Sequence, residues 1–326
     1  MSNGSDERPD AEERIDALAE IAMRFARVRG EIEKVYIGPE TIVEALMIAL
    51  LARGHVLIEG VPGIAKTTLV KTFAQTLDCS YRRIQFTPDL LPSDITGTYI
   101  FNRRNDEFVL REGPIFANIV LGDEINRAPA KTQSALLEAM QEEQVTVEGT
   151  TRALERPFLV LATQNPIEQE GVYLLPEAQL DRFLIKLDMG YPTLEDELVI
   201  MVTHARETEP VEPVLSPAEV LRWSQLVEEV TVRRELVEYI VNLSRYTRAA
   251  AQVSLGASPR ASIALMRGAK ARAVLRGRDF VLPDDIKALA PLVLTHRILL
   301  HPESELSGVS SRQVVQMALD SVPYAS

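Results

Sequence analysis

The first 190 positions of the chain contain five short apolar or β-rich runs, which longer segments of mixed character separate. Runs of this length fit strands rather than helices, and continuous apolar strands are typical of sheets buried on both faces. Strands that alternate with helices indicate a parallel sheet covered by helices on both sides. The predicted strands cover residues 56–59, 81–86, 119–122, 158–163 and 183–187.

Helical periodicity of apolar residues marks the rest of the chain. Two helices are predicted before the first strand, at 12–28 and 39–52, and the pair Arg53-Gly54 predicts the C-cap of the second. Beyond residue 190 no further strong strand pattern occurs. Six helices are predicted there, at 193–207, 217–229, 234–250, 259–275, 283–299 and 311–321.

These patterns predict an α/β core followed by an all-helical domain, here called the lid. We expect a flexible tail at 1–12, a nucleotide-binding core at 13–190 and the lid at 191–326. Within the core, alternating segments at 97–110 and 145–154 predict two hairpins. Both fit plain surface hairpins as well as elements with a working role.

Composition narrows the class of protein. The chain has 326 residues, which is enough for two domains. No apolar run approaches the roughly 20 residues that span a bilayer, so no stable membrane insertion is expected. The first 14 residues lack the apolar segment of a signal peptide. Cys79 is the only cysteine, so no intrachain disulfide can form, and a cytoplasmic location is expected.

Charge and histidine content argue against nucleic-acid binding and against a zinc site. The net charge of −12 repels a polyanion, so no nucleic acid is expected as the default partner, although a local basic ring could override this. The four histidines show no spacing of a zinc site.

A glycine-containing loop directly after the first predicted strand has the pattern of a phosphate-binding loop (P-loop). In this pattern a buried strand stops, glycines let the backbone curl, and the next helix directs its N-terminal amides at an anion. Lys66 would reach the β- and γ-phosphates of ATP, and the Thr67 hydroxyl would ligate Mg²⁺. The predicted nucleotide-binding residues of this segment are Gly60, Val61, Pro62, Gly63, Ile64, Ala65, Lys66, Thr67 and Thr68.

Ala65 departs from the strict pattern, which has a second glycine at this position. Because Ala carries a Cβ, we expect it to follow the loop only if its φ is negative.

Two further strand ends carry polar side chains that suit nucleotide hydrolysis. Asp123 would order the Mg²⁺ shell, and the adjacent Glu124 would polarise a water for attack on the γ-phosphate. Without other evidence, these two acids would be interpreted as solvated side chains at the end of a strand. The phosphate loop in the same chain favours a catalytic role. Asn165 could position the attacking water, or it could simply begin a turn with the proline that follows.

Three strings of residues resemble the MoxR family of AAA+ ATPases, and the resemblance covers about residues 30 to 320. They are Asp123-Glu124-Ile125-Asn126-Arg127-Ala128-Pro129, Ala162-Thr163-Gln164-Asn165-Pro166 and Leu175-Pro176-Glu177-Ala178-Gln179-Leu180-Asp181-Arg182-Phe183. The resemblance implies an AAA+ core with a helical lid. The family also accepts Ala where this chain has Ala65, whereas Gly122 stands where a bulkier residue is more usual.

The resemblance assigns further roles. Asn165 matches the sensor 1 residue, Arg182 matches the arginine finger that enters the neighbouring subunit's nucleotide site, and Arg260 matches the sensor 2 arginine. Ile37 and Gly38 match a segment beside the adenine. The plainer alternatives are a surface ion pair for Arg182, a solvated helix start for Arg260 and core packing for the segment at 35–38. Arg127 is expected near a subunit boundary, with no catalytic step.

An arginine finger that acts in trans implies a homo-oligomer, most simply a hexameric ring with ATP at each interface. The resemblance implies a chaperone-like remodeller that matures client proteins, often with a partner carrying a von Willebrand factor A domain. One rival function is a nucleic-acid translocase, against which the acidic charge counts. Another is a nucleotide-dependent switch that barely hydrolyses ATP, which an intact Glu124, Asn165 and Arg182 oppose.

Overall fold

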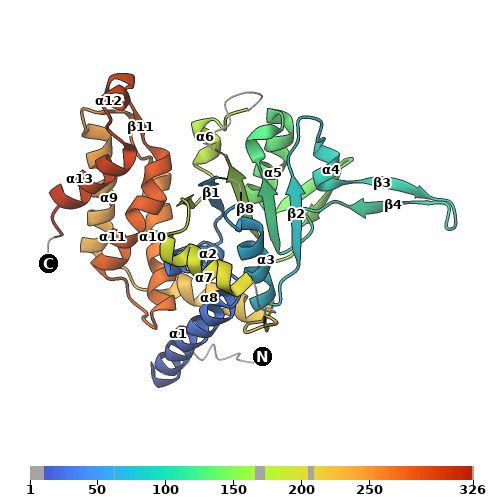
Figure 1. Ribbon diagram of the computed structural model, residues 1–326, viewed down its shortest axis with the longest axis horizontal. Coiled ribbons are helices and arrows are strands. Elements are labelled where there is room, and N and C mark those ends of the chain that lie inside the picture. Colours follow the sequence, from blue (N-terminus) through green and yellow to red (C-terminus); the bar gives the residue numbers. More distant parts are fainter. Residues whose placement is uncertain (1–10, 62, 166–172, 205–208, 325–326) are drawn as a thin grey trace, which may run out of the picture.

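A computed structural model describes residues 11–61, 63–165, 173–204 and 209–324. Its α/β part contains a five-stranded sheet, and a helical part lies beside it, on the left in Figure 1. Most of the predicted tail lies outside the described residues. Within the described part, no helix is both long and apolar enough to cross a membrane.

The sheet is parallel throughout and has the order β2-β5-β8-β1-β9, which confirms the predicted five-stranded parallel sheet. Its interior side chains are fully buried aliphatic residues such as Ile58, Leu121 and Leu161. The strands are β1 (Val56–Gly60), β2 (Tyr81–Gln85), β5 (Ile119–Asp123), β8 (Leu159–Gln164) and β9 (Ile185–Met189).

Strand register brings the carboxyl ends of β2, β5, β8 and β1 to one edge of the sheet. Gln85 of β2 pairs with Asp123 of β5, and Glu59 of β1 pairs with Gln164 of β8. In a parallel sheet the residues that follow such strands lie at the same edge. The loop after β1 and the polar ends of β2, β5 and β8 are therefore neighbours.

The helices of this part are α1 (Ala11–Glu33), α2 (Glu40–Leu51), α3 (Lys66–Thr76), α4 (Pro92–Thr96), α5 (Ala130–Glu142) and α6 (Glu177–Leu180), with a 3₁₀ turn η1 (Ile125–Arg127). The end of α2 differs from the expected glycine cap. Arg53, not Gly54, takes the left-handed conformation, with φ of 51°. Gly54 is needed for another reason, since a Cβ there would lie 2.5 Å from Leu184 Cβ.

Both predicted hairpins are present. They are formed by β3 (Gly97–Asn102) with β4 (Glu107–Glu112), and by β6 (Gln144–Val147) with β7 (Thr150–Ala153). The β3–β4 hairpin extends far from the body of the molecule (Figure 1). Phe101 and Phe108 face each other across it with ring centroids 5.3 Å apart, and both are exposed.

The predicted lid is helical except for one short antiparallel pair of strands, so its description as all-helical needs correction. The helix predicted at 283–299 ends at Leu294, so its last five predicted residues lie outside it. Residues 295–297 form a 3₁₀ turn, and residue 299 belongs to β11. Strands of two and three residues leave no periodic signal in a sequence. The elements are α7 (Leu194–His204), α8 (Pro217–Glu229), α9 (Arg234–Ala249), β10 (Val253–Leu255), α10 (Pro259–Leu275), α11 (Pro283–Leu294), η2 (Thr295–Arg297), β11 (Leu299–Leu300), α12 (Pro302–Leu306) and α13 (Ser311–Ser321).

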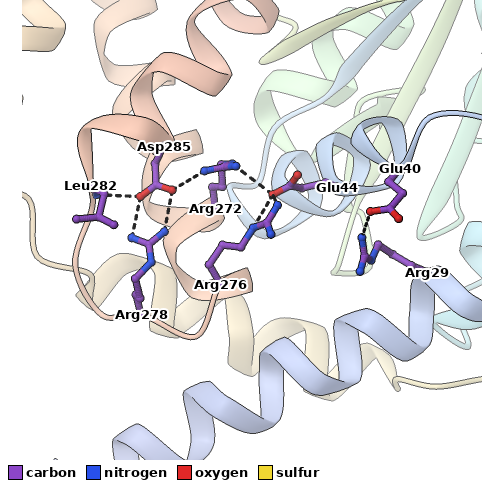
Figure 2. A network of polar contacts seen from close by, with 8 residues as sticks. All are labelled: Arg29, Glu40, Glu44, Arg272, Arg276, Arg278, Leu282 and Asp285. Carbon is purple, nitrogen blue, oxygen red and sulfur yellow. Dashed lines mark hydrogen bonds and ion pairs between the residues drawn. The ribbon is translucent and has the colours of Figure 1, made fainter.

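A chain of ion pairs connects the lid to α2 (Figure 2). Glu44 of α2 bonds Arg272 of α10 at 3.3 Å and Arg276, the residue directly after α10, at 3.0 Å. Arg272 also bonds the buried carboxylate of Asp285 on α11, which Arg278 contacts from the other side. Burial favours the neutral acid, but these bonds outweigh it and keep the pKa of Asp285 below its ordinary value.

One apolar core runs through both parts of the molecule. Leu46 of α2 and Ile58 of β1 belong to the same buried cluster as Leu265, Leu289 and Val315 of the lid. Shared packing of this kind gives no sharp domain border. The division between residues 190 and 191 therefore stays a prediction.

His55, directly before β1, is held in one neutral tautomer. Its Nε2 donates to the Met140 carbonyl at 2.8 Å, and its Nδ1 accepts from the Val160 N–H at 3.0 Å. Burial lowers the pKa of His55 to about 4. Because protonation would remove the acceptor, the folded chain resists taking up this proton.

We therefore expect the fold to lose stability in mild acid. His55 is neutral in both states above its ordinary pKa, but between that value and about 4 only the unfolded chain binds the proton, so stability falls as pH falls. Urea unfolding measures the free energy of unfolding at about pH 7.5 and at about pH 5.5. The decrease in this free energy between the two pH values should be smaller by about 1 kcal/mol in His55→Gln than in the unchanged chain. His301→Gln, at an exposed histidine, is the matched control. An equal drop in all three proteins would contradict the assignment.

Candidate functional site

The loop between β1 and α3 has the glycines that a phosphate cradle requires. A Cβ on Gly60 would lie 2.4 Å from the carbonyl oxygen of Met189 on β9, so no side chain fits there. Gly63 has a φ of +86° and open space around it. Pro62 lies outside the described residues. The N-terminus of α3 follows at Lys66, and the first amides of a helix have no partner within the helix.

Ala65 does not behave as expected. It occupies the N-cap of α3 with φ of 57° and ψ of 22°, the left-handed conformation. The expectation of a negative φ was therefore wrong. A left-handed residue other than glycine costs about 1–2 kcal/mol, which the surrounding structure must offset.

A cavity of about 450 Å³ lies against this loop and collects residues from four strand ends. It contains the predicted lysine and threonine of the loop, both acids and the amide. These groups had been predicted from separate segments, and the fold brings them together. The lining residues are Gly60, Gly63, Ala65, Lys66, Thr67, Arg83, Gln85, Asp123, Glu124, Thr163, Gln164 and Asn165.

Lys66 is the half-buried cation of this cavity. Its Nζ donates to the Gly60 carbonyl oxygen at 2.6 Å. Burial lowers the pKa of Lys66, while the nearby Asp123 and Glu124 carboxylates act in the opposite direction. A charged ammonium beside a glycine loop suits an anion with several oxygens.

Asp123 is held between two neighbouring strands. The Thr163 hydroxyl of β8 donates to its Oδ1 at 2.6 Å, and Arg83 Nη2 of β2 donates to its Oδ2 at 2.5 Å. Carboxylate and hydroxyl oxygens are the ligands that Mg²⁺ prefers, so Asp123 and Thr67 suit this ion. Among the described residues, no group of three or more His, Cys, Asp or Glu could hold a metal without further ligands.

Glu124 takes a left-handed conformation with φ of 58°, directly after β5. Its N–H donates to Thr163 Oγ1 at 2.8 Å, so one hydroxyl fixes both acids. Gln85 Nε2 donates to Glu124 Oε2 at 2.7 Å, and Arg127 Nε lies 3.3 Å from the same oxygen. The carboxylate is therefore ordered by two partners.

Sequence reasoning missed Arg83, Gln85 and Thr163. Side chains two apart on a strand share a face, so Arg83 and Gln85 both reach β5 from β2. Thr163 precedes the predicted Asn165 at the next strand end. Polar residues at the ends of three adjacent parallel strands were the available signal.

A second cavity of about 540 Å³ adjoins the first, because Gly63 and Ala65 line both. Ile37 and Gly38 of the segment expected beside the adenine also line it, together with Ile64 and Thr68 of the phosphate-loop segment. Much of its wall is apolar, which suits a flat base.

Tyr36 narrows this second cavity beside the loop. A Cβ on Gly38 would lie 2.6 Å from the Tyr36 hydroxyl oxygen, so the ring packs over the glycine. Burial raises the pKa of Tyr36 to about 12, which keeps the phenol neutral.

Three of the predicted residues that the structure describes line neither cavity. Val61 follows β1, and Arg260 is exposed at the start of α10. Arg182 is exposed in the turn after α6, where its Nη1 donates to the Leu137 carbonyl at 2.8 Å. A finger for a neighbouring subunit would lie outside its own subunit's cavity, so this placement leaves the predicted role of Arg182 open.

Known proteins match the chain over both of its parts. The family model described as "ATPase family associated with various cellular activities (AAA)" matches residues 55–185, and the one described as "AAA lid domain" matches residues 245–318. The chain is similar to the protein named "Chaperone MoxR1" of Mycobacterium tuberculosis, with 43% identity over 94% of this chain and 84% of that protein.

Two further proteins also match most of the chain. "Protein MoxR" of Methylorubrum extorquens is 32% identical over 86% of this chain and 89% of its own length. The crystal structure of a protein from Cytophaga hutchinsonii superposes with a TM-score of 0.90 at 44% identity, covering 95% of this chain and 98% of that one.

The geometry of the loop predicts a large loss of ATP binding in Lys66→Ala. Hydrogen bonds to a charged group contribute about 1.5–3 kcal/mol, so the dissociation constant should rise about tenfold to a hundredfold. Calorimetry measures it directly. Lys71→Ala is the matched control, because Lys71 is exposed on the same helix and lines neither cavity. Equal affinities of the two variants would contradict a role of this loop in binding ATP.

Proposed function

Because the chain belongs to the MoxR family of AAA+ ATPases, we propose that it binds ATP with Mg²⁺ and hydrolyses it to ADP and phosphate. The observation that carries the proposal is the single cavity shared by the glycine loop, the two acids and Asn165. The adjoining apolar cavity would receive the adenine and the loop the triphosphate.

Each residue of the cavity has a role that its position supports. Lys66 would bind the β- and γ-phosphate oxygens once it leaves the Gly60 carbonyl. Glu124 would polarise the attacking water and take up its proton, and Asn165 would orient that water. Thr67 and Asp123 would hold Mg²⁺, which neutralises charge on the phosphates.

The charged groups already have protein partners before a nucleotide arrives. Asp123 is bonded by Arg83, and Glu124 by Gln85 and Arg127. Such contacts order the carboxylates and offset their mutual repulsion. Binding of a triphosphate would replace some of these contacts with new ones, and the site would not have to become ordered at that step.

The proposed assembly is a homo-oligomeric ring, most simply a hexamer. Arg182 is exposed and does not line the cavity of its own subunit. A guanidinium from a neighbour would spread positive charge over the γ-phosphate oxygens as the bond breaks. The same ring would let Arg260 act from the lid when the lid angle changes.

We further propose a chaperone-like remodeller that uses the cycle to mature or activate client proteins, with a partner carrying a von Willebrand factor A domain. One relative bears the name chaperone. The exposed Phe101 and Phe108 on the projecting β3–β4 hairpin offer apolar contact area for a protein client. Cys79 is the only cysteine and is free, which is consistent with the proposed cytoplasmic location.

Mixing two inactive variants tests the shared site. Glu124→Gln keeps the finger but lacks the base, and Arg182→Ala keeps the base but lacks the finger. Each variant alone should lose about a thousandfold in turnover. Mixed rings should recover part of it, because an intact Arg182 then meets an intact Glu124 across an interface.

Steady-state phosphate release measures the recovery, and native mass spectrometry establishes that the rings contain both variants. Rings assembled from one variant alone are the control. Fully mixed rings without recovery would contradict action in trans.

A further inference from the structure

One lid residue is bonded to the chain around Arg182. Arg297 ends the turn η2 directly after α11, and its side chain is only 4% exposed. Its Nε donates to Asp181 Oδ1 at 2.7 Å, and its Nη2 donates to the Asp181 carbonyl at 3.1 Å. The two segments are far apart in sequence but in contact in the fold.

The same guanidinium also bonds the two residues that follow Arg182 in sequence. Nη2 donates to the Phe183 carbonyl at 2.7 Å, and Nη1 donates to the Leu184 carbonyl at 3.2 Å. The fifth bond runs from Nη1 to Val293 on α11. All five N–H donors of an arginine are thus used, and four of them hold residues 181–184.

A second lid residue strengthens this attachment. His296 Nε2 donates to the Phe183 carbonyl at 3.0 Å. Burial, with a smaller effect from Arg297, lowers the pKa of His296 well below its ordinary value, so the ring stays neutral. The Phe183 ring is fully buried, while Arg182 beside it is exposed. The backbone is therefore fixed on both sides of Arg182, whose exposed side chain is bonded in this structure to the Leu137 carbonyl.

Two other arginine contacts between the lid and α2, among the described residues, lack this property. Arg267 of α10 bonds the Ala52 carbonyl, and Glu44 bonds Arg272 and Arg276. These contacts hold the lid to the end or the face of α2 and touch neither Arg182 nor its neighbours in sequence.

We propose that Arg297 is a positioning residue that fixes the Arg182 finger of its own subunit for use in the neighbouring subunit. The planar fork of five donors suits this task, because it bonds the Asp181 carboxylate and three carbonyls of residues 181–184 at fixed angles, with the fifth donor on α11. A lid that rotates would move residues 181–184 with it. The lid position of one subunit would then set the reactivity of ATP bound in the next. This inference rests on the proposed action of Arg182 in trans.

The mixed-ring assay separates this role from a general effect on folding. In that assay Glu124→Gln subunits donate the finger and Arg182→Ala subunits accept it. Arg297→Met is added to the donor in one mixture and to the acceptor in another. We expect the recovered kcat to fall about tenfold or more in the first mixture, with KM for ATP unchanged, because the finger acts in the transition state. The second mixture should keep its recovery.

Arg267→Met is the matched control, since it also removes a lid arginine bonded to a core carbonyl. It should show no difference between donor and acceptor. Should Arg297→Met fail to fold, as judged by thermal melting, Arg297→Lys replaces it. Lysine retains a charge for Asp181, but its three donors cannot replace the four bonds to residues 181–184, so the same asymmetry is expected.

The outcomes are distinct. Absence of recovery without any Arg297 change would reject action in trans and, with it, the premise. Recovery that Arg297→Met or Arg297→Lys lowers equally in donor and acceptor, or lowers only in the acceptor, would reject the positioning role while leaving the proposed function intact. Unchanged recovery in both mixtures would reject the positioning role as well.

Discussion

The pairing register of the parallel sheet is the constraint on which the site depends. Because β2, β5, β8 and β1 are adjacent and point the same way, their carboxyl ends form one polar edge. A shift by one residue would turn Asp123 away from Arg83 and Thr163, since successive side chains face opposite sides. Buried aliphatic residues on both faces of the sheet fix that register, so the apolar core indirectly sets the geometry of the charges.

At this polar edge, positively charged side chains balance the charge of the two acids. Two adjacent carboxylates would repel each other, but Arg83, Arg127 and Lys66 lie around them, and the Thr163 hydroxyl bonds to both acidic residues. The site is thus ordered before a ligand binds. Preformed sites of this kind lose less conformational freedom on binding.

Much of the fold and part of the site could be predicted from the sequence, because local patterns encode them. Five short apolar or β-rich runs predicted the strands, and the loop from Gly60 to Thr67 and the acids at the end of β5 carried recognisable spacing. Contacts between distant segments left no such pattern. Arg83, Gln85 and Thr163 became visible only through strand register, β10–β11 through tertiary pairing, and the Arg297 attachment across 116 residues of chain. Ala65 shows that a loop can impose a conformation that residue preference alone argues against.

The central claim is that ATP is cleaved between subunits, so that a single subunit is an incomplete enzyme. Turnover per subunit, measured across a dilution series alongside sedimentation velocity with ATP and Mg²⁺ present, tests it most directly. The account predicts that activity rises and falls with the fraction of assembled rings. Constant activity per subunit in samples that sediment as monomers would contradict it.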